Sequence, residues 1–418
     1  MKQIRTADRL DATVSIPGSK SVTHRYLVMA ALAQGRSQLQ NALWCADTRY
    51  TATALERMGA QIIHSSDAVE VVGTGGTLRS PSAPVFLENA GTSMRLLTAV
   101  ACLSQGTCVL TGDERMHSRP IGELLNGLRP LGGMVESLEQ EGYPPVKVDG
   151  GGLKGGRTEV DASRSSQFVS AILLAAPYAA QSVEVIVQGL VSRPYVDITL
   201  EGMSSFGVKA DWVDAKTLRV GAPGSYLSGT YRVEGDSSSA SYFWAAAAIT
   251  GGKVTTLNLR RTSSQGDLAL LQLLERMGCR VHWADNGVTV SGGPLRGIEV
   301  DMSDMPDMVP TLAITAAYAQ GTTIIANVAH LRLKESDRLQ TVAEGLQRMK
   351  IQVEEGEDGL LIRGGKPQGA MIAAHDDHRI AMSFAVAGLG TEGVRIDDES
   401  CVEKSFPQFW ETLEQLYS

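Results

Sequence analysis

Hydrophobic and polar positions follow a pattern along the chain that returns about every seventy residues. In each copy, a cluster of polar or small residues precedes an Ala- and Leu-rich stretch with helical periodicity. The clusters begin at six positions, each 70 to 74 residues after the last: Ser19, Asn89, Ser163, Asp236, Asp307 and Asp377. The apolar stretches behind them predict helices that include residues 26–32, 94–103, 168–176, 242–249, 311–319 and 380–389.

A second pattern keeps step with the first. A helix ends at a Met-Gly-like junction and runs into a strand at residues 55–62, 128–135, 203–208, 274–281 and 346–353. Glycine there supplies the left-handed cap that lets the chain reverse direction. The last copy has Lys350 where glycine is expected. Short β-rich stretches such as residues 69–72, 217–220, 287–290 and 360–363 close the units.

This repeat predicts an α/β fold made of six units. Each unit is too small to bury a core alone, so the units should pack against one another. A chain of 418 residues with 43% hydrophobic content is long enough for two domains, which suggests three units in each. The best boundary that the sequence offers is a short hinge near residues 232–237.

Composition narrows the possible partners. A net charge of −8 gives no electrostatic reason to expect nucleic acid or an anionic membrane, so any basic cluster is expected to hold a small anion. The five cysteines are scattered and include no Cys-x-x-Cys pair, which fits a reducing compartment and argues against a zinc site. The first fourteen residues are too polar for a signal peptide, and the most apolar run, residues 168–180, is too short to span a bilayer. We therefore expect a cytoplasmic protein.

The first helix entrance is the best candidate for an anion site. Ser19 or Ser21 is expected to cap a helix that stops near Gly35, and Arg25 lies four residues beyond Ser21 on the same face. Lys20 stands beside the free N–H groups and the positive end of the helix dipole. The alternative is a capped surface helix with solvated charges.

Three further stretches have a binding and a structural interpretation. Residues 88–95 contain Gly91, which allows close backbone approach, and Arg95. Arg119 is fixed before Pro120, where it could clamp a carboxylate or phosphate. Residues 163–167 carry more hydroxyls than a helix cap requires, which hints at a phosphorylated or polyhydroxylated ligand. A helix cap or a surface loop would account for each stretch taken alone.

Acidic residues allow two interpretations as well. Asp301, Asp304 and Asp307 fall at spacings of three, and residues 375–378 read His-Asp-Asp-His, so both could suggest a metal site. We favour helix capping, because both stretches occupy the helix-entrance position. On a helix, residues 332–338 would place Lys334 and Glu335 on the face of Arg338, either as a solvated surface or as an acid–base site.

Taken in order, these motifs resemble the signatures of the 5-enolpyruvylshikimate-3-phosphate synthase family, from about Ser15 to Phe406. They are residues 17–21, 89–92 with Arg95, 119–122, 165–167, 334–338 and 377–379. The resemblance implies a two-domain inside-out α/β barrel with three βαβαββ repeats in each domain. Domain I would comprise residues 1–18 and 235–418, domain II residues 19–234, and the active site would lie in the interdomain cleft.

The resemblance also implies a reaction. The enolpyruvyl group of phosphoenolpyruvate would pass to the 5-hydroxyl of shikimate 3-phosphate with release of phosphate, without a cofactor or metal, in a monomer. One alternative is the sister UDP-N-acetylglucosamine enolpyruvyl transferase family, which typically carries a reactive Cys in the loop that matches residues 112–120, where this chain has none. Another is a non-catalytic clamp of six repeats, which should be basic along its inner surface.

Residue roles follow by resemblance at the matching positions. Contacts to shikimate 3-phosphate are expected from Lys20, Ser21, Arg25, Ser165, Ser166, Gln167, Ser192, Tyr195, Asp307 and Lys334. Contacts to phosphoenolpyruvate are expected from Lys20, Asn89, Gly91, Arg119, Gln167, Arg338, Arg379 and Lys404. Catalysis is assigned to Asp307 as the base for the 5-hydroxyl, to Glu335 with Lys334 as the pair that protonates the methylene, and to Lys20.

Two positions are informative within the family pattern. His330 stands where many members have Asn, so the substrate contact at that position is open. Gly91, rather than Ala, suggests an unobstructed phosphoenolpyruvate pocket, which predicts sensitivity to the family inhibitor glyphosate.

Overall fold

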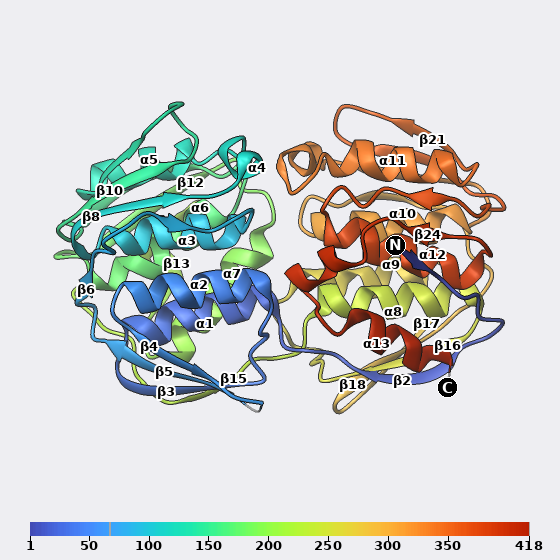
Figure 1. Ribbon diagram of the computed structural model, residues 1–418, viewed down its shortest axis with the longest axis horizontal. Coiled ribbons are helices and arrows are strands. Elements are labelled where there is room, and N and C mark those ends of the chain that lie inside the picture. The colour runs from blue at the N-terminus through green and yellow to red at the C-terminus, as the bar shows by residue number, and fades with distance from the viewer. Residues whose placement is uncertain (67, 418) are drawn as a thin grey trace. The chain divides into compact units, whose positions relative to one another are not determined.

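The computed structural model describes residues 1–66 and 68–417, which form two compact units (Figure 1). Unit 1 comprises Met1–Pro17 and Glu234–Ser418, and unit 2 comprises Gly18–Val233. The chain therefore begins in unit 1, builds unit 2 and returns. The boundaries expected from the sequence, after residues 18 and 234, lie one residue further along the chain.

Unit 2 contains three sheets and the helices between their strands. Its helices are α1 (Lys20–Leu32), α2 (Ala46–Arg57), α3 (Gly91–Ala101), α4 (Glu114–His117), α5 (Gly122–Leu128), α6 (Gln167–Ala175) and α7 (Arg193–Ser205). Its strands are β3 (Gln34–Gln40), β4 (Gln61–His64), β5 (Ala68–Thr74), β6 (Leu78–Arg79), β7 (Val85–Phe86), β8 (Ser104–Thr111), β9 (Met134–Ser137), β10 (Val146–Gly150), β11 (Gly156–Asp161), β12 (Val183–Gln188), β13 (Ala210–Trp212), β14 (Thr217–Val220) and β15 (Thr230–Arg232).

Unit 1 is built in the same way. Its helices are α8 (Ser237–Thr250), α9 (Leu270–Met277), α10 (Val309–Ala317), α11 (Arg338–Arg348), α12 (His378–Gly390) and α13 (Phe409–Glu414). Its strands are β1 (Lys2–Gln3), β2 (Asp11–Ser15), β16 (Lys253–Leu257), β17 (Arg280–Ala284), β18 (Gly287–Ser291), β19 (Glu299–Asp301), β20 (Thr322–Ala326), β21 (Gln352–Glu355), β22 (Leu360–Arg363), β23 (Met371–Ile372) and β24 (Arg395–Ile396).

The repeats have the order βαβαββ, as the run β11-α6-β12-α7-β13-β14 shows, except for the last, which contains β23, α12, β24 and α13. In that sheet β11 is parallel to β12, β12 is antiparallel to β14, and β14 is antiparallel to β13. The sheets β19-β20-β22-β21 and β17-β18-β16-β2 have the same arrangement. The predicted α/β fold of repeated βαβαββ units is confirmed.

Three strands pair with partners far from them in the chain. β2 immediately precedes α1 of unit 2, yet it pairs with β16 of unit 1 over five residues. Conversely, β15 precedes α8 of unit 1 but pairs with β3 of unit 2. The last repeat is short, and β1 completes its sheet by pairing with β24.

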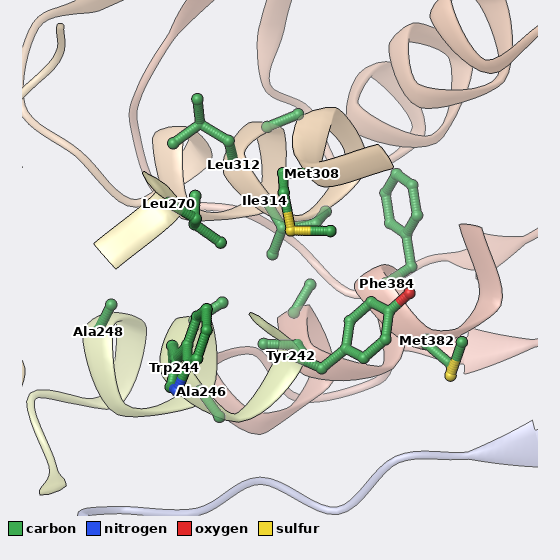
Figure 2. Packing of buried hydrophobic residues seen from close by; sticks show 14 of the residues in the cluster. Tyr242, Trp244, Ala246, Ala248, Leu270, Met308, Leu312, Ile314, Met382 and Phe384 are labelled. Atoms are coloured by element: carbon green, nitrogen blue, oxygen red, sulfur yellow. The ribbon is translucent and has the colours of Figure 1, made fainter. Parts of the chain in front are cut away.

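The interior of each unit is made by helices rather than by facing sheets. α1, α3 and α6 contact one another in unit 2, as α8, α10 and α12 do in unit 1. These helices are buried almost all round, which explains their Ala-, Leu- and Met-rich sequences. Figure 2 shows aromatic and aliphatic side chains from α8, α10 and α12 meeting in the interior of unit 1. The buried Trp244 donates its indole N–H to Thr256 Oγ1 at 2.8 Å, so its polar atom has a partner.

Left-handed residues stand at the predicted helix-to-strand junctions. Gly59, Gly132, Gly207 and Gly278 have φ values of 114°, 91°, 82° and 116°. Lys350 occupies the fifth junction with a φ of 63°, so the backbone conformation persists without glycine. Among residues 1–66 and 68–417, no helix has the length and apolar character needed to cross a membrane.

Candidate active site

The sequence predicts where six helices begin, and the structure has α1, α3, α6, α8, α10 and α12 there. Few of these helices have a side-chain cap at the first turn. Asp236 accepts hydrogen bonds from the N–H groups of Ser238 and Ser239, and Asp377 accepts one from Arg379 N–H. Ser19 occupies the N-cap position of α1 without a side-chain cap bond within the described residues, and Ser21 lies inside the helix. The expected cap by Ser19 or Ser21 is therefore wrong. The Ser19 side chain does not accept a hydrogen bond from the N–H groups of the first turn of α1.

Lys20, the first residue of α1, has an acidic partner that sequence reasoning missed. Its Nζ lies 3.1 Å from Oδ2 of Asp47, a buried residue in the first turn of α2. This ion pair holds the amine at the positive end of α1. The only sequence signal of Asp47 is its place in a helix first turn, which by itself indicates a favourable dipole contact.

Arg25 lies inside unit 2 rather than on its surface. Its guanidinium donates to Thr199 Oγ1 at 2.7 Å, to the carbonyl of Ser21 at 2.8 Å and to the carbonyl of Tyr195 at 3.0 Å. It also bonds Ser170 Oγ at 3.2 Å, and burial lowers the pKa of Arg25 to about 10. Arg25 thus braces α1 against α6 and α7, and its direct contact with substrate stays a prediction.

The entrance of α3 gathers several of the predicted residues. Arg119 is buried and donates through Nη1 to the backbone oxygen of Asn89 at 3.0 Å and to its Oδ1 at 2.8 Å. Arg95 Nη1 donates to the carbonyl of Gly91 at 3.1 Å and to Gln167 Oε1 at 3.3 Å. A Cβ at Gly91 would stand 2.5 Å from Nη2 of Arg119 and from Nη1 of Arg95. A Cβ at this position would therefore need both guanidinium groups to shift, whereas the backbone conformation does not call for glycine.

The remaining residues predicted in unit 2 lie at two other helix entrances. Ser165 Oγ accepts the N–H of Gln167 at 3.2 Å, and the buried Ser166 is the N-cap residue of α6. Ser192 precedes α7 in a left-handed conformation with a φ of 55°, and Tyr195 N–H donates to its carbonyl at 3.1 Å. Gln167 also donates to Thr92 Oγ1 at 3.0 Å, which ties the α6 and α3 entrances together.

In unit 1, Arg338 is the centre of a buried charge cluster. Its side chain is 2% exposed, and it bonds Asp307 Oδ1 at 2.9 Å, Glu335 Oε2 at 2.9 Å and Asp377 Oδ2 at 2.8 Å. Asp377 is fully buried and also accepts a hydrogen bond from Ser336 Oγ at 3.0 Å. Because Asp377 caps α12 and fixes Arg338 together, it positions the cluster, a role that its sequence motif did not reveal.

Asp307 is shared by two arginines. Its Oδ1 takes Nη1 of Arg338, and its Oδ2 takes Nη2 of Arg379 at 2.6 Å. Burial opposes ionisation of this carboxyl, but Arg379, Arg338 and Lys334 together hold the pKa of Asp307 well below its usual range. The interpretation of Asp307 as a helix cap is wrong, because it lies in the 3₁₀ turn Pro306–Met308 and accepts side-chain donors instead.

Asp301, the first of the three spaced acids, has hydrogen-bond partners of its own. Asp301 Oδ1 accepts Ser303 N–H at 2.8 Å, and Asn327 donates to its Oδ2 at 2.6 Å. No group of three or more His, Cys, Asp or Glu within residues 1–66 and 68–417 could hold a metal ion.

The segment that carries Lys334 and Glu335 is not helical, contrary to expectation. It links the 3₁₀ turn Ala329–Leu333 to α11, which begins at Arg338 after the N-cap Asp337. The ion pair between Glu335 and Arg338 forms nevertheless, at 2.9 Å. Asp337 stops the helix from extending backwards because its side chain accepts Gln340 N–H at 3.1 Å.

Two more predicted residues belong to unit 1. His330 is buried, and burial together with Lys334 lowers its pKa to about 4, so the imidazole is neutral at pH 7. Lys404, the last residue of the 3₁₀ turn Ser400–Lys404, is 8% exposed. The structure thus joins Asp307, Glu335, Arg338 and Arg379 in one network of unit 1, and Asn89, Gly91, Arg119 and Gln167 in one region of unit 2.

Comparison with known proteins gives a consistent result. The family model described as EPSP synthase (3-phosphoshikimate 1-carboxyvinyltransferase) matches residues 4–413. A 3-phosphoshikimate 1-carboxyvinyltransferase of Syntrophobacter fumaroxidans is 47% identical, with both chains covered in full. One of Klebsiella pneumoniae is 45% identical over 98% of this chain and 97% of the relative.

A solved structure agrees with the sequence relatives. The EPSP synthase of Acinetobacter baumannii superposes with a TM-score of 0.82 and 31% sequence identity, over 99% of this chain and 97% of that chain.

Proposed function

The chain belongs to the EPSP synthase family, the 3-phosphoshikimate 1-carboxyvinyltransferases, and we propose that it transfers the enolpyruvyl group of phosphoenolpyruvate to the 5-hydroxyl of shikimate 3-phosphate. The products are 5-enolpyruvylshikimate 3-phosphate and phosphate. The reaction proceeds by addition and elimination, and this chain needs no cofactor or metal for it.

The observation that carries this proposal is the network around Asp307 in unit 1. Addition to C2 of an enol phosphate needs a base at the attacking oxygen, a proton at C3 and cations at the substrate's phosphate and carboxylate. Asp307 supplies the base, Glu335 with Lys334 supplies the proton, and Arg338 and Arg379 supply the cations. Asp307 and Glu335 each form an ion pair with Arg338, and Asp307 forms a second one with Arg379.

The same network explains how Asp307 becomes basic. Arg379 and Arg338 hold the pKa of Asp307 low, which makes it a poor proton acceptor as long as they are bonded to it. A phosphate or carboxylate of phosphoenolpyruvate that binds Arg379 and Arg338 weakens their bonds to Asp307. The base is therefore activated when phosphoenolpyruvate is present, close to the oxygen of the second substrate.

Unit 2 supplies the remaining contacts in this proposal. Lys20, Asn89, Gly91, Arg119 and Gln167 bind phosphoenolpyruvate, whereas Ser21, Arg25, Ser165, Ser166, Ser192 and Tyr195 hold or frame shikimate 3-phosphate. Lys404 joins Arg338 and Arg379 on the phosphoenolpyruvate side. We propose that the protein acts as a cytoplasmic monomer.

Phosphate release with both substrates tests the proposal. Asp307→Ala and Lys20→Ala should each lose roughly 3–4 kcal/mol of transition-state stabilisation, a fall of several hundredfold in kcat/KM. Asp285→Asn, in the exposed turn between β17 and β18, is the matched control and should retain wild-type activity. Full activity of either alanine variant would overturn the role of that residue.

A panel of acceptors separates the alternatives. The wild-type protein should release phosphate with shikimate 3-phosphate and not with UDP-N-acetylglucosamine, and it should not bind duplex DNA. Turnover of the UDP-sugar alone would favour the sister transferase, and DNA binding without turnover would favour the clamp.

A further inference from the structure

Unit 1 contains a cavity that shares no residue with the proposed active site. Its volume is about 490 Å³, which is within the range of pockets that hold small molecules. It lies where α8 ends and β16 begins, beside the first residue of β2 and the last residue of β18. Its lining includes three cations, Arg9, Lys253 and Arg280, and one acid, Asp11.

The strand register places the polar lining residues in one row across the sheet. Lys253 on β16 is the register partner of Asp11 on β2 and of Ser291 on β18. Ser291 is in turn the partner of Arg280 on β17. Register partners carry their side chains on the same face of a sheet. The strands of Lys253 and Arg280 are two strand spacings apart, about 10 Å, so these long side chains can meet over the hydroxyl of Ser291.

Close backbone contacts form the wall of the cavity. A Cβ at Gly252 would lie 2.5 Å from the backbone nitrogen of Leu10, and one at Gly292 would lie 2.3 Å from the carbonyl oxygen of Ala247. Lys253 N–H donates to the Leu10 carbonyl at 2.7 Å, and Gly292 N–H donates to the Gly252 carbonyl at 2.8 Å. The wall is therefore preformed, and a ligand does not have to order it on binding.

Positive charge dominates this lining, on a chain whose net charge is −8. Lys253 Nζ pairs with Asp11 Oδ1 at 3.1 Å, and both side chains are more than half exposed. Within residues 1–66 and 68–417, the side chains of Arg9 and Arg280 have neither an ion pair nor a hydrogen bond. Two guanidinium groups are thus available to an anion that enters the cavity.

We propose that this cavity binds the phosphate group of a small metabolite, at a second anion site that is independent of the proposed function. A phosphate has more oxygen atoms than a carboxylate, so it can accept hydrogen bonds from Arg9, Lys253 and Arg280 at the same time. Lys253 exchanges Asp11 for the ligand, which costs little because an exposed ion pair contributes little to stability.

The alternative is a purely structural role. The cavity lies at the C-terminal end of α8, where cations are favourable because they face the negative end of the helix dipole. The two roles differ in what they predict for ligand binding.

Calorimetric titration of the full chain with inorganic pyrophosphate, at low ionic strength, tests the site. Wild type should bind one more pyrophosphate per chain than the double variant Arg9→Gln/Arg280→Gln, whose Kd at this site should rise tenfold or more. Arg157→Gln, the same change on the exposed face of β11 in unit 2, is the matched control and should bind as wild type does. Equal stoichiometry and affinity in wild type and the double variant would overturn the proposal.

A change at Asp11 should act in the opposite direction. Asp11→Asn removes the competitor for Lys253, so pyrophosphate should bind several-fold more tightly. Asp211→Asn removes the acid of an exposed ion pair with Lys209 in unit 2 and should leave binding unchanged. If the cations serve only α8, Asp11→Asn will change the Tm without changing the affinity for pyrophosphate, and the proposal will be wrong.

Activity separates this site from the proposed function. The double variant should release phosphate from the two substrates at the wild-type rate, because neither arginine belongs to the proposed active site. Loss of activity in parallel with loss of pyrophosphate binding would contradict an independent site. A wild-type chain without transferase activity would overturn the proposed function, while the pyrophosphate titrations would still decide whether the cavity binds phosphate.

Discussion

At position 91 a single added methyl group would meet two buried arginines. The Cβ of any other residue would lie 2.5 Å from a guanidinium nitrogen of Arg119 and 2.5 Å from one of Arg95. Gly91→Ala must push Arg119 and Arg95 aside, which costs about 1–3 kcal/mol when a packed site is overfilled. We expect the KM for phosphoenolpyruvate to rise about tenfold or more, with a smaller change in kcat.

The same space underlies the predicted inhibition by glyphosate. Wild type should be inhibited in the phosphate-release assay, and Gly91→Ala should need more inhibitor. Gly151→Ala is the matched control, because a Cβ there meets no atom within 4 Å and the residue is exposed. Full wild-type activity at inhibitor concentrations well above the substrate would contradict the prediction.

Single-residue chemistry was predictable where it depends on neighbours in the sequence. Glu335 and Arg338 lie three residues apart, and their ion pair could be expected even though the intervening segment is not helical. The partners of Lys20 and Arg338 could not be expected, since Asp47 and Asp377 lie 27 and 39 residues away. Such pairs arise only when separate repeats pack together.

At the level of elements, the repeat itself carried most of the information. Helix and strand positions followed from apolar periodicity and from glycine at the reversals, because both depend on local backbone conformation. Capping residues were less reliable than apolar periodicity for predicting how a helix begins. At the α1 entrance Ser19 stands in the N-cap position without a side-chain cap bond, and the buried Arg25, six residues further on, donates to the carbonyl of Ser21.

The degenerate junction at Lys350 gives a prediction at this scale. Lys350 is exposed and has a φ of 63°, a conformation that costs a residue with a Cβ about 1 kcal/mol or more relative to glycine. After allowing for the greater freedom of glycine in the unfolded chain, Lys350→Gly should stabilise unit 1 by roughly 0.5–1 kcal/mol. Urea unfolding followed by circular dichroism would measure this gain.

Lys350→Ala is the control for that gain. Alanine removes the charge and the long side chain but keeps the Cβ, so it should give no increase in stability. Equal stabilisation by alanine and glycine would show that the lysine side chain, and not the left-handed backbone, is the unfavourable feature.

At the scale of the whole molecule, unit 2 has the structure of an insertion into unit 1. Pro17 and Asp236 are adjacent in unit 1, where the carbonyl of Pro17 accepts Asp236 N–H at 2.9 Å. Gly18 and Val233, the ends of unit 2, are also neighbours, since a Cβ on Gly18 would lie 3.2 Å from Val233 Cγ1. Two domains of three repeats could be inferred from chain length and period. The pairing of β2 with β16 and of β15 with β3 could not be inferred, because the residue pattern of a strand does not reveal which strand it pairs with.

This arrangement predicts that unit 1 folds after unit 2 is removed, provided that the N-terminal segment stays attached. Ile4, Leu10, Val14 and Ile16 are buried in the unit 1 core, and burial of each such side chain is worth about 1.5–3 kcal/mol. Their sum is comparable to the whole stability of a typical domain, about 5–15 kcal/mol. A chain that joins residues 1–17 to 234–418 should therefore unfold cooperatively in a thermal melt followed by circular dichroism. Residues 234–418 alone should not, and equal melting of the two chains would show that the N-terminal strands are dispensable.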